Sequence, residues 1–140
     1  MQAPNKPDFF AILLNTKTIA VVGLSENSLR PSHIVASYMK SQGYQIIPVN
    51  PKYASVLGEM CFPGLLDVPS AIRVDMVNIF RKTEAVPLIV EQAIQRGVAG
   101  IWMQEGIFHR EAAEKAASAG LWVVMDRCLM IEHRHVSRRA

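Results

Sequence analysis

A regular alternation of short apolar runs with segments of helical period most constrains how this chain can fold. The runs contain mainly Val, Ile, Met and aromatic residues, and polar residues do not alternate through them. They are TIAVVG (18–23), QIIPVN (45–50), DMVNIF (75–80), AGIWM (99–103) and LWVVMD (121–126). Such runs are typical of parallel strands that are covered on both faces of a sheet.

Helical segments separate most of these runs. The predicted helices span 7–14, 32–43, 83–97 and 110–120. Ser32 is a candidate N-cap for the second of them, and glycine ends each of the last three. Segment 53–72 contains several Gly and Pro residues, and it predicts an irregular link or one short helix.

Strand–helix–strand repeats of this length predict right-handed crossovers between parallel strands. We therefore expect an α/β fold, a three-layer Rossmann-like doubly wound parallel sheet of about five strands in the order 3-2-1-4-5. With 140 residues, half of them hydrophobic, the chain predicts one domain over 1–140. Its core is expected over 15–132, and 133–140 is expected to be a basic, disordered tail.

Composition narrows the environment and the partners. No apolar stretch reaches the ~20 residues of a membrane span, and the N-terminus lacks the pattern of a signal peptide. Only Cys61 and Cys128 are present, which fits a reducing compartment, so we expect a cytoplasmic protein. The net charge of +3 favours an anionic ligand. The basic residues are not interleaved with aromatic ones, so nucleic acid is not an expected partner, and the lack of a long apolar stretch makes a membrane an unexpected one.

Ligands of such sheets bind beyond the carboxyl ends of the strands, where the first run leads into a serine-rich segment, GLSENSLRPS. Its backbone N–H groups and the following helix N-terminus suit phosphate oxygens, and hydroxyls and a guanidinium add donors. The candidate ligand contacts here are Gly23, Leu24, Ser25, Ser28, Arg30 and Ser32. The alternative is an ordinary strand–helix turn in which Ser32 only caps the helix.

The second run ends in Asn50, Pro51 and Lys52. Domains that bind NAD usually place Asp or Glu here, where the carboxylate accepts hydrogen bonds from the ribose diol. A lysine would instead pair with a phosphate on the ribose, which indicates NADP or coenzyme A. A surface lysine after an Asn-Pro turn is the structural alternative.

The later strand ends supply further candidates. Phe80 could pack on an adenine, and Arg81 adds positive charge. Gln104 and Glu105 follow the fourth run, although Glu105 also fits an ordinary loop position. Cys128 follows the fifth run, and a buried structural cysteine is the commoner role for such a residue.

Taken in order, these segments resemble the small stand-alone CoA-binding domain proteins, which are related to the CoA-binding N-terminal domain of the succinyl-CoA synthetase alpha subunit. The resemblance covers roughly residues 15–132. It rests on VVGLSENSLRPS, IIPVNPKYASVLGE, VDMVNIFRKTEAVPLIVEQAI and GIWMQEGIFHREAAEKAASAGLWVVMDRCL. It implies coenzyme A as the ligand, bound through its ADP portion.

The resemblance also implies roles for individual residues. It places Gly23, Ser25 and the loop with Arg30 against the diphosphate, and Lys52 near the phosphorylated ribose. Two further pairs lie along the ligand: Phe80 and Arg81 near the adenine and ribose, and Gln104 and Glu105 on the path of the pantetheine arm.

Three functions remain open at this point. The first is a carrier or sensor of CoA or acyl-CoA without ligase chemistry of its own, since the chain has no room for the ligase's other domains. The second is an enzyme, either an NADP-dependent reductase or a CoA-thioester enzyme that uses Cys128 or Glu105. The third is an interaction domain that has lost the ligand. No catalytic constellation is evident, so the sequence favours the first, with a homodimer or a protein partner left open.

Overall fold

A parallel five-stranded sheet forms the centre of the computed structural model, which describes residues 8–138. Its strands are β1 (Thr18–Val22), β2 (Gln45–Val49), β5 (Met76–Ile79), β6 (Gly100–Met103) and β7 (Trp122–Val124). They lie in the order β2-β1-β5-β6-β7, and every neighbouring pair is parallel. Nearly every residue of β1, β2, β5 and β6 is buried, as their unbroken apolar runs predict.

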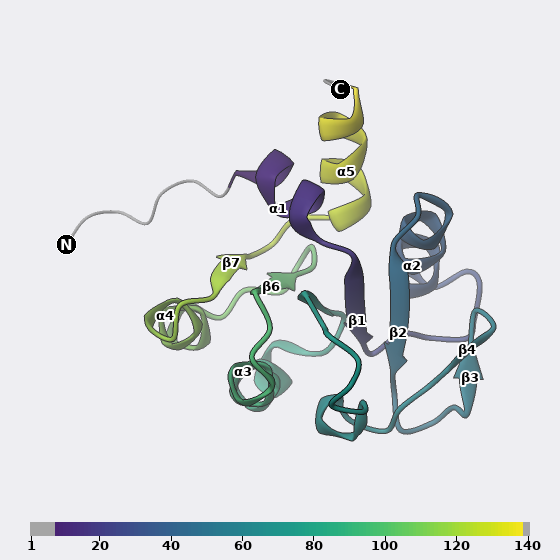
Figure 1. The fold of residues 1–140 in the computed structure, drawn as a ribbon, viewed down its shortest axis with the longest axis horizontal. Coiled ribbons are helices and arrows are strands. Elements are labelled where there is room, and N and C mark those ends of the chain that lie inside the picture. The colour runs from purple at the N-terminus through teal and green to yellow at the C-terminus, as the bar shows by residue number, and fades with distance from the viewer. Residues whose placement is uncertain (1–7, 139–140) are drawn as a thin grey trace.

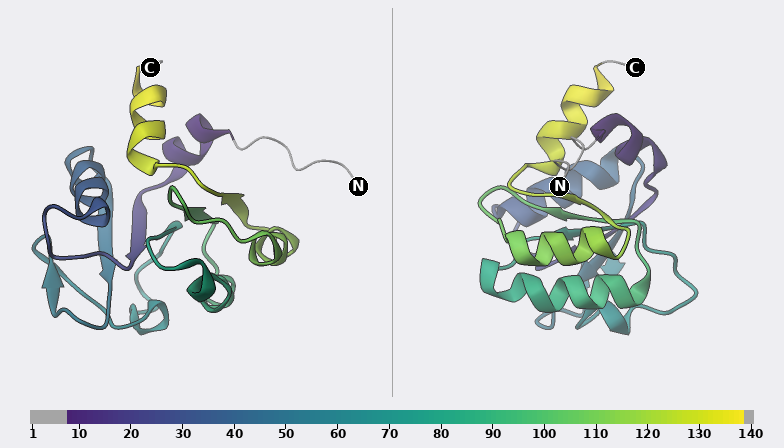
Figure 2. Two further views of the ribbon diagram at one scale, coloured as in Figure 1. Left: turned by 180° about the vertical axis from the view of Figure 1, so that it is seen from behind. Right: turned by 90° about the vertical axis from the view of Figure 1, so that its left-hand side faces the viewer.

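Helices cover both faces of this sheet and give three layers (Figure 1). One face carries α1 (Phe9–Asn15), α2 (Pro31–Ser41) and α5 (Leu129–Ser137). The other face carries α3 (Val86–Arg96) and α4 (Arg110–Ser118), which lie side by side in Figure 2. Two apolar clusters, one on each face, form the core, and Trp102 is the bulkiest of the fully buried side chains.

The predicted α/β class and the doubly wound parallel sheet are confirmed. The predicted strand order is wrong, because β5 pairs with β1 on the side opposite β2 and does not lie beyond β2. Apolar runs identify strands but do not show on which side of β1 the chain returns. The observed order still places a switch point beside β1, now between β1 and β5.

The chain between β2 and β5 is more regular than predicted. It forms a small antiparallel hairpin of β3 (Ser55–Val56) and β4 (Glu59–Met60), followed by a 3₁₀ helix, η1 (Leu65–Asp67). The hairpin turn uses positive φ at Leu57 and Gly58. The one short helix of the prediction is present as η1, but the hairpin was not predicted.

The prediction of a disordered tail is wrong for 133–138. Helix α5 continues to Ser137 and is capped at Arg138, and residues 139 and 140 lie outside the described part of the chain. Leu129 and Val136 are buried, so one face of α5 packs onto the protein although its sequence is basic. Between residues 8 and 138, every helix is too short or too polar to cross a bilayer.

Candidate functional site

The candidate site lies where the chain leaves β1 and β5 toward opposite faces of the sheet. After β1 the chain enters α2 on one face, and after β5 it passes through η2 (Thr83–Ala85) into α3 on the other. The arrowheads of β1 and β2 in Figure 1 point to this edge. Doubly wound sheets bind ligands at such a switch point.

Gly23 brings the ends of three strands into contact. Its φ is +92°, and its N–H donates to the Val49 carbonyl at 2.8 Å. A Cβ atom added at this position would lie 2.6 Å from the Phe80 carbonyl oxygen and 2.9 Å from Cδ of Arg81. Only glycine fits here, because both the backbone angle and the adjacent strand exclude a side chain. The Arg81 side chain therefore passes directly over the start of the serine-rich loop.

Hydrogen bonds within the loop hold it in a defined shape. The Ser25 N–H donates to Oγ of Ser32 at 3.0 Å, the Asn27 N–H donates to Oγ of Ser25 at 3.0 Å, and the Leu29 N–H donates to Oδ1 of Asn27 at 2.9 Å. Ser32 is buried and is not the N-cap that the sequence predicts, because Arg30 occupies that position and Pro31 begins the helix. By accepting the Ser25 N–H, the Ser32 hydroxyl holds the loop against the first turn of α2.

This pattern determines which loop groups are left for a ligand. Within residues 8–138, the N–H groups of Leu24, Glu26 and Ser28 donate to no protein acceptor, whereas those of the residues between them do. The side chain of Leu24 is fully buried, so this residue can contribute only backbone. Ser28 and Arg30 are exposed. Ser28 also borders a hollow of about 380 Å³ between α2 and α5.

Asn50 joins the end of β2 to this loop. Its side-chain amide donates to the Leu24 carbonyl at 3.1 Å, and its Oδ1 accepts from the Lys52 N–H at 3.0 Å. The Asn50 carbonyl accepts from the Cys61 thiol at 3.4 Å, and burial raises the pKa of that thiol. The side chain of Asn50 is thus occupied in the fold, while Pro51 and Lys52 after it are exposed.

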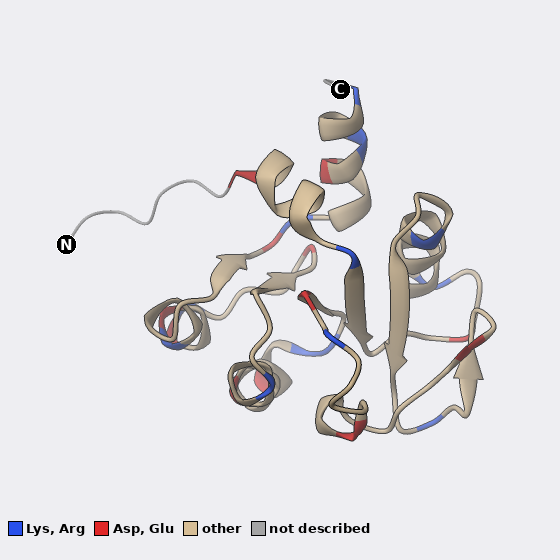
Figure 3. Ribbon diagram, in the orientation of Figure 1, with Lys and Arg blue, Asp and Glu red and all other residues tan. Residues whose placement is uncertain are grey.

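Unpaired positive charge collects at this edge. Arg30, Lys52, Arg81 and Lys82 are all exposed, and within the described residues none of them forms an ion pair with a carboxylate. Figure 3 shows basic segments in the chain after β2 and in the chain that leads to α3. Phe80 is half-buried beside them. An anion would be attracted to these groups.

Gln104 and Glu105 occupy very different environments. Gln104 is 5% exposed, and its Oε1 accepts from the Asn78 amide at 3.4 Å and from the Leu129 N–H at 3.2 Å. It therefore ties β5, β6 and the start of α5 together. Glu105 is exposed in the turn after β6. The Gly106 N–H in this turn donates to Oδ1 of Asp126 at 2.7 Å.

Cys128 lies at the N-cap of α5 and is buried. Within the part of the chain that the structure describes, neither this thiol nor the Glu105 carboxylate is hydrogen-bonded to a histidine. The structure thus does not bring either group together with the base that an activated nucleophile needs.

Sequence reasoning missed two residues at this edge. Asn78 is buried in β5, donates to the Trp102 carbonyl at 3.2 Å, and leaves its Oδ1 without a protein donor. Asp126 adopts φ of +58° and fixes the turn at Gly106. A lone Asn inside an apolar run was a visible signal for the first, and the position at the end of the fifth predicted strand was one for the second.

Comparisons with known proteins agree with the likeness seen in the sequence. The profile of a family described as the CoA binding domain matches residues 17–134. The chain is 38% identical over 133 residues to the Bacillus subtilis protein YneT, named as uncharacterized, and the match covers 95% of this chain and 97% of YneT. It also resembles the structure of a hypothetical protein from Pyrococcus horikoshii OT3, with a TM-score of 0.89 and 38% identity, over 97% of this chain and 99% of that one.

The chain also matches one part of a much longer protein. The chain is 32% identical over 107 residues to acetate–CoA ligase [ADP-forming] II from Archaeoglobus fulgidus, a match that covers 75% of this chain and 16% of the ligase. The present chain therefore corresponds to less than a fifth of that protein. With a family profile that spans most of its length, the chain belongs to the CoA-binding domain family.

Proposed function

We propose that this protein binds coenzyme A or an acyl-CoA at the carboxyl edge of its sheet, through the phosphorylated ADP portion, and acts as a carrier or sensor without ligase chemistry of its own. One observation carries the proposal. In a chain of the CoA-binding domain family, the glycine turn after β1 lies under the Arg81 side chain, and the chain segments after β1, β2 and β5 add exposed, unpaired cations at the same edge of the sheet.

The phosphates have a matching set of donors. The N–H groups of Leu24, Glu26 and Ser28 remain available to diphosphate oxygens, and Gly23 lets a ligand approach the backbone. Arg30 and Arg81 flank this turn with guanidinium groups, which suit phosphate oxygens.

In this proposal Lys52 selects a nucleotide with a phosphorylated ribose over NAD. It is exposed after β2, where a domain that binds NAD would place an acid for the ribose diol. Its ammonium group would pair with the phosphate on the ribose of coenzyme A. The half-buried ring of Phe80 would pack on the adenine side, and Glu105 would line the path of the pantetheine arm.

The absence of an activated group in the described region favours binding over turnover. A thioester enzyme needs a nucleophile or a base next to the thioester. Within the described residues, Cys128 is buried at a helix cap, and neither its thiol nor the Glu105 carboxylate is hydrogen-bonded to a histidine. Neither group therefore has the partner that an activated nucleophile would need.

Calorimetric titration tests this proposal. The protein is titrated with CoA, acetyl-CoA, dephospho-CoA, NADP and NAD under identical conditions. We expect CoA to bind best and dephospho-CoA about tenfold less well, because an exposed charge-assisted hydrogen bond contributes about 1.5 kcal/mol. The Lys52→Gln variant should bind CoA and dephospho-CoA equally.

A matched control is Lys17→Gln, which removes a lysine at the opposite edge of the sheet and should leave CoA affinity unchanged. Equal binding of CoA and dephospho-CoA by the unaltered protein would refute the role of Lys52. Preferential binding of NADP, or of no nucleotide, would refute the proposed ligand.

A further inference from the structure

A second cavity lies at the other edge of the sheet, far from the site proposed for CoA. It has a volume of about 560 Å³ and opens between α1, α5 and the amino ends of β1 and β2. Lys17 directly precedes β1, and Tyr44 directly precedes β2. The volume of the cavity falls within the ~300–1,000 Å³ that is usual for sites that bind small molecules.

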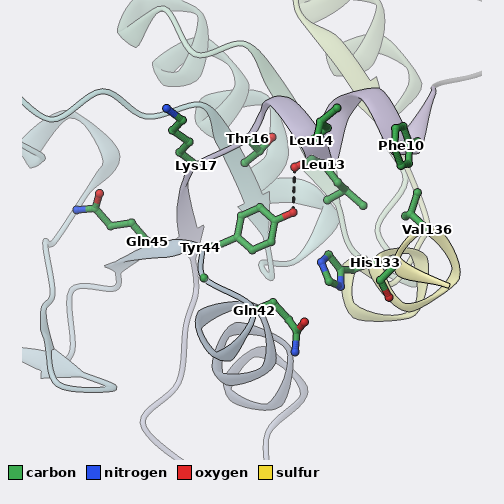
Figure 4. A pocket seen from close by; sticks show the side chains of 12 residues that line it. Phe10, Leu13, Leu14, Thr16, Lys17, Gln42, Tyr44, Gln45, His133 and Val136 are labelled. Carbon is green, nitrogen blue, oxygen red and sulfur yellow. Dashed lines mark hydrogen bonds between the residues drawn. The ribbon is translucent and has the colours of Figure 1, made fainter. Parts of the chain in front are cut away.

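Both apolar and polar side chains line this cavity, and some of the apolar ones are exposed. Leu13 of α1 and Val136 of α5 lie on one side of it, and Leu14 lies at its rim (Figure 4). Leu14 is 71% exposed, and Phe10 at the same rim is 43% exposed. Large apolar side chains exposed beside a hollow often mark a binding surface.

Aromatic groups of fixed orientation form its centre. Figure 4 shows Tyr44 between Lys17 on one side and His133 on the other, with the Tyr44 hydroxyl donating to the Leu13 carbonyl at 2.9 Å. Nδ1 of His133 is 2.8 Å from the Tyr38 hydroxyl. Burial raises the pKa of Tyr44 and lowers the pKa of His133, so both rings are uncharged at neutral pH.

The charge of the lining points to the kind of ligand. Among the described residues that line the cavity, Lys17 is the one Lys or Arg, and none is Asp or Glu. Within residues 8–138 the ammonium group of Lys17 forms no ion pair with a carboxylate. Its flexible stem lets this ammonium turn toward a ligand that lies against Tyr44.

We infer that this cavity is a second binding site, which takes a small amphipathic monoanion: a carboxylate with a short aliphatic chain. The carboxylate pairs with Lys17, and the chain lies over Tyr44 toward Leu13, Leu14 and Val136. This inference does not depend on CoA binding, because no residue of the carboxyl edge lines the cavity.

Titration with matched eight-carbon probes tests the inference. Octanoate and octylamine are added below the concentrations at which they form micelles and 1-octanol below its solubility limit, and the amide signals of Gly43 and Tyr44 are followed by NMR. We expect octanoate to saturate one site per chain and to bind about fivefold more tightly than octanol, the difference expected for an exposed ion pair. Octylamine should bind more weakly than either.

Two variants and a control make the test specific. Lys17→Gln should abolish the preference for octanoate over octanol, and Leu14→Asp should weaken octanoate binding at least tenfold without unfolding an exposed position. Lys82→Gln, at the carboxyl edge, should change nothing. CoA titration of Lys17→Gln and Leu14→Asp should be unaffected, so failure of this site and failure of the CoA site are distinguishable.

Other outcomes would overturn the inference. These are equal affinity for octanoate and octanol, signal changes at Leu24 and Glu26 with none at Gly43, and no saturable binding. A protein that sediments as a dimer and becomes monomeric on Leu14→Asp would show that a second copy covers this face.

Discussion

The two edges of the sheet offer ligands different chemistry. At the carboxyl edge the donors are backbone N–H groups of a serine-rich loop, and the charges around them are exposed cations. At the amino edge the cavity is lined by apolar, aromatic and polar side chains from α1, α5 and the segments that precede β1 and β2. In a parallel sheet the helices begin at the carboxyl edge and end at the amino edge, so backbone dipoles attract anions only at the first. An anion at the amino edge must rely on a side chain, here Lys17.

The largest expected effect is a difference in stability between alanine variants of two glycines, one at each edge. Gly23 and Gly43 have nearly the same φ, +92° and +98°, but only Gly23 touches another strand. Gly23→Ala should lower the free energy of unfolding by about 3 kcal/mol, from left-handed backbone strain plus a clash with β5. Gly43→Ala should cost about 1 kcal/mol, from strain alone.

Urea denaturation of both variants measures this difference. Gly23→Ala should also lose CoA binding under conditions in which it is still folded, whereas Gly43→Ala should retain it. Equal loss of stability in the two variants would show that the contact between Gly23 and Phe80 does not restrict the site.

A smaller effect is expected from the hydrogen bond between the Ser25 N–H and the Ser32 hydroxyl. Ser32→Ala removes the acceptor of the Ser25 N–H and should lower the free energy of unfolding by about 1–2 kcal/mol. CoA affinity should fall about fivefold, because the loop is less well ordered. Ser37→Ala on the exposed side of the same helix is the control, and both are measured by denaturation and calorimetry. An unchanged affinity in Ser32→Ala would contradict a pre-formed phosphate loop.

The smallest effect concerns the amino edge and pH. Burial lowers the pKa of His133 in the folded protein, so below the unfolded-state value of about 6.5 the unfolded chain binds a proton more readily. His133 should therefore contribute a loss of stability as the pH falls from 7 to 5. His133→Gln should reduce the slope of stability against pH. The slope is measured by denaturation at several pH values. An unchanged slope in His133→Gln would show that this histidine does not contribute to the pH dependence of stability.

Much of the fold could be predicted from the sequence, because apolar runs that are buried on both faces carry an unambiguous signal. The five strands and the helices α2, α3 and α4 lie close to their predicted ranges. The side of β1 on which β5 returns could not be predicted, since it depends on how the link after β2 packs. Helix α5 was missed because its polar face dominates its composition, although Val136 is buried.

The candidate site was predicted less evenly. Strand ends and glycines locate the edge, so Gly23 and Arg81 could be expected to lie near each other, and the structure places them in contact. Side chains that serve the fold cannot be told from ligand contacts by position alone. Gln104 follows a strand end and Ser32 closes the loop after β1, yet both are buried and already hydrogen-bonded within the protein.

The amide of Gln104 offers a route by which occupants of the two edges would affect each other. It links the turn after β6 to the first N–H of α5, and α5 carries His133 and Val136 to the amino-edge cavity. A ligand at the carboxyl edge that alters this hydrogen bond would change the free energy with which α5 closes the cavity. Thermodynamic reciprocity then requires that an occupant of the cavity change CoA affinity by the same factor. Gln104→Glu, which presents a carboxylate to Leu129, would alter the size of that factor.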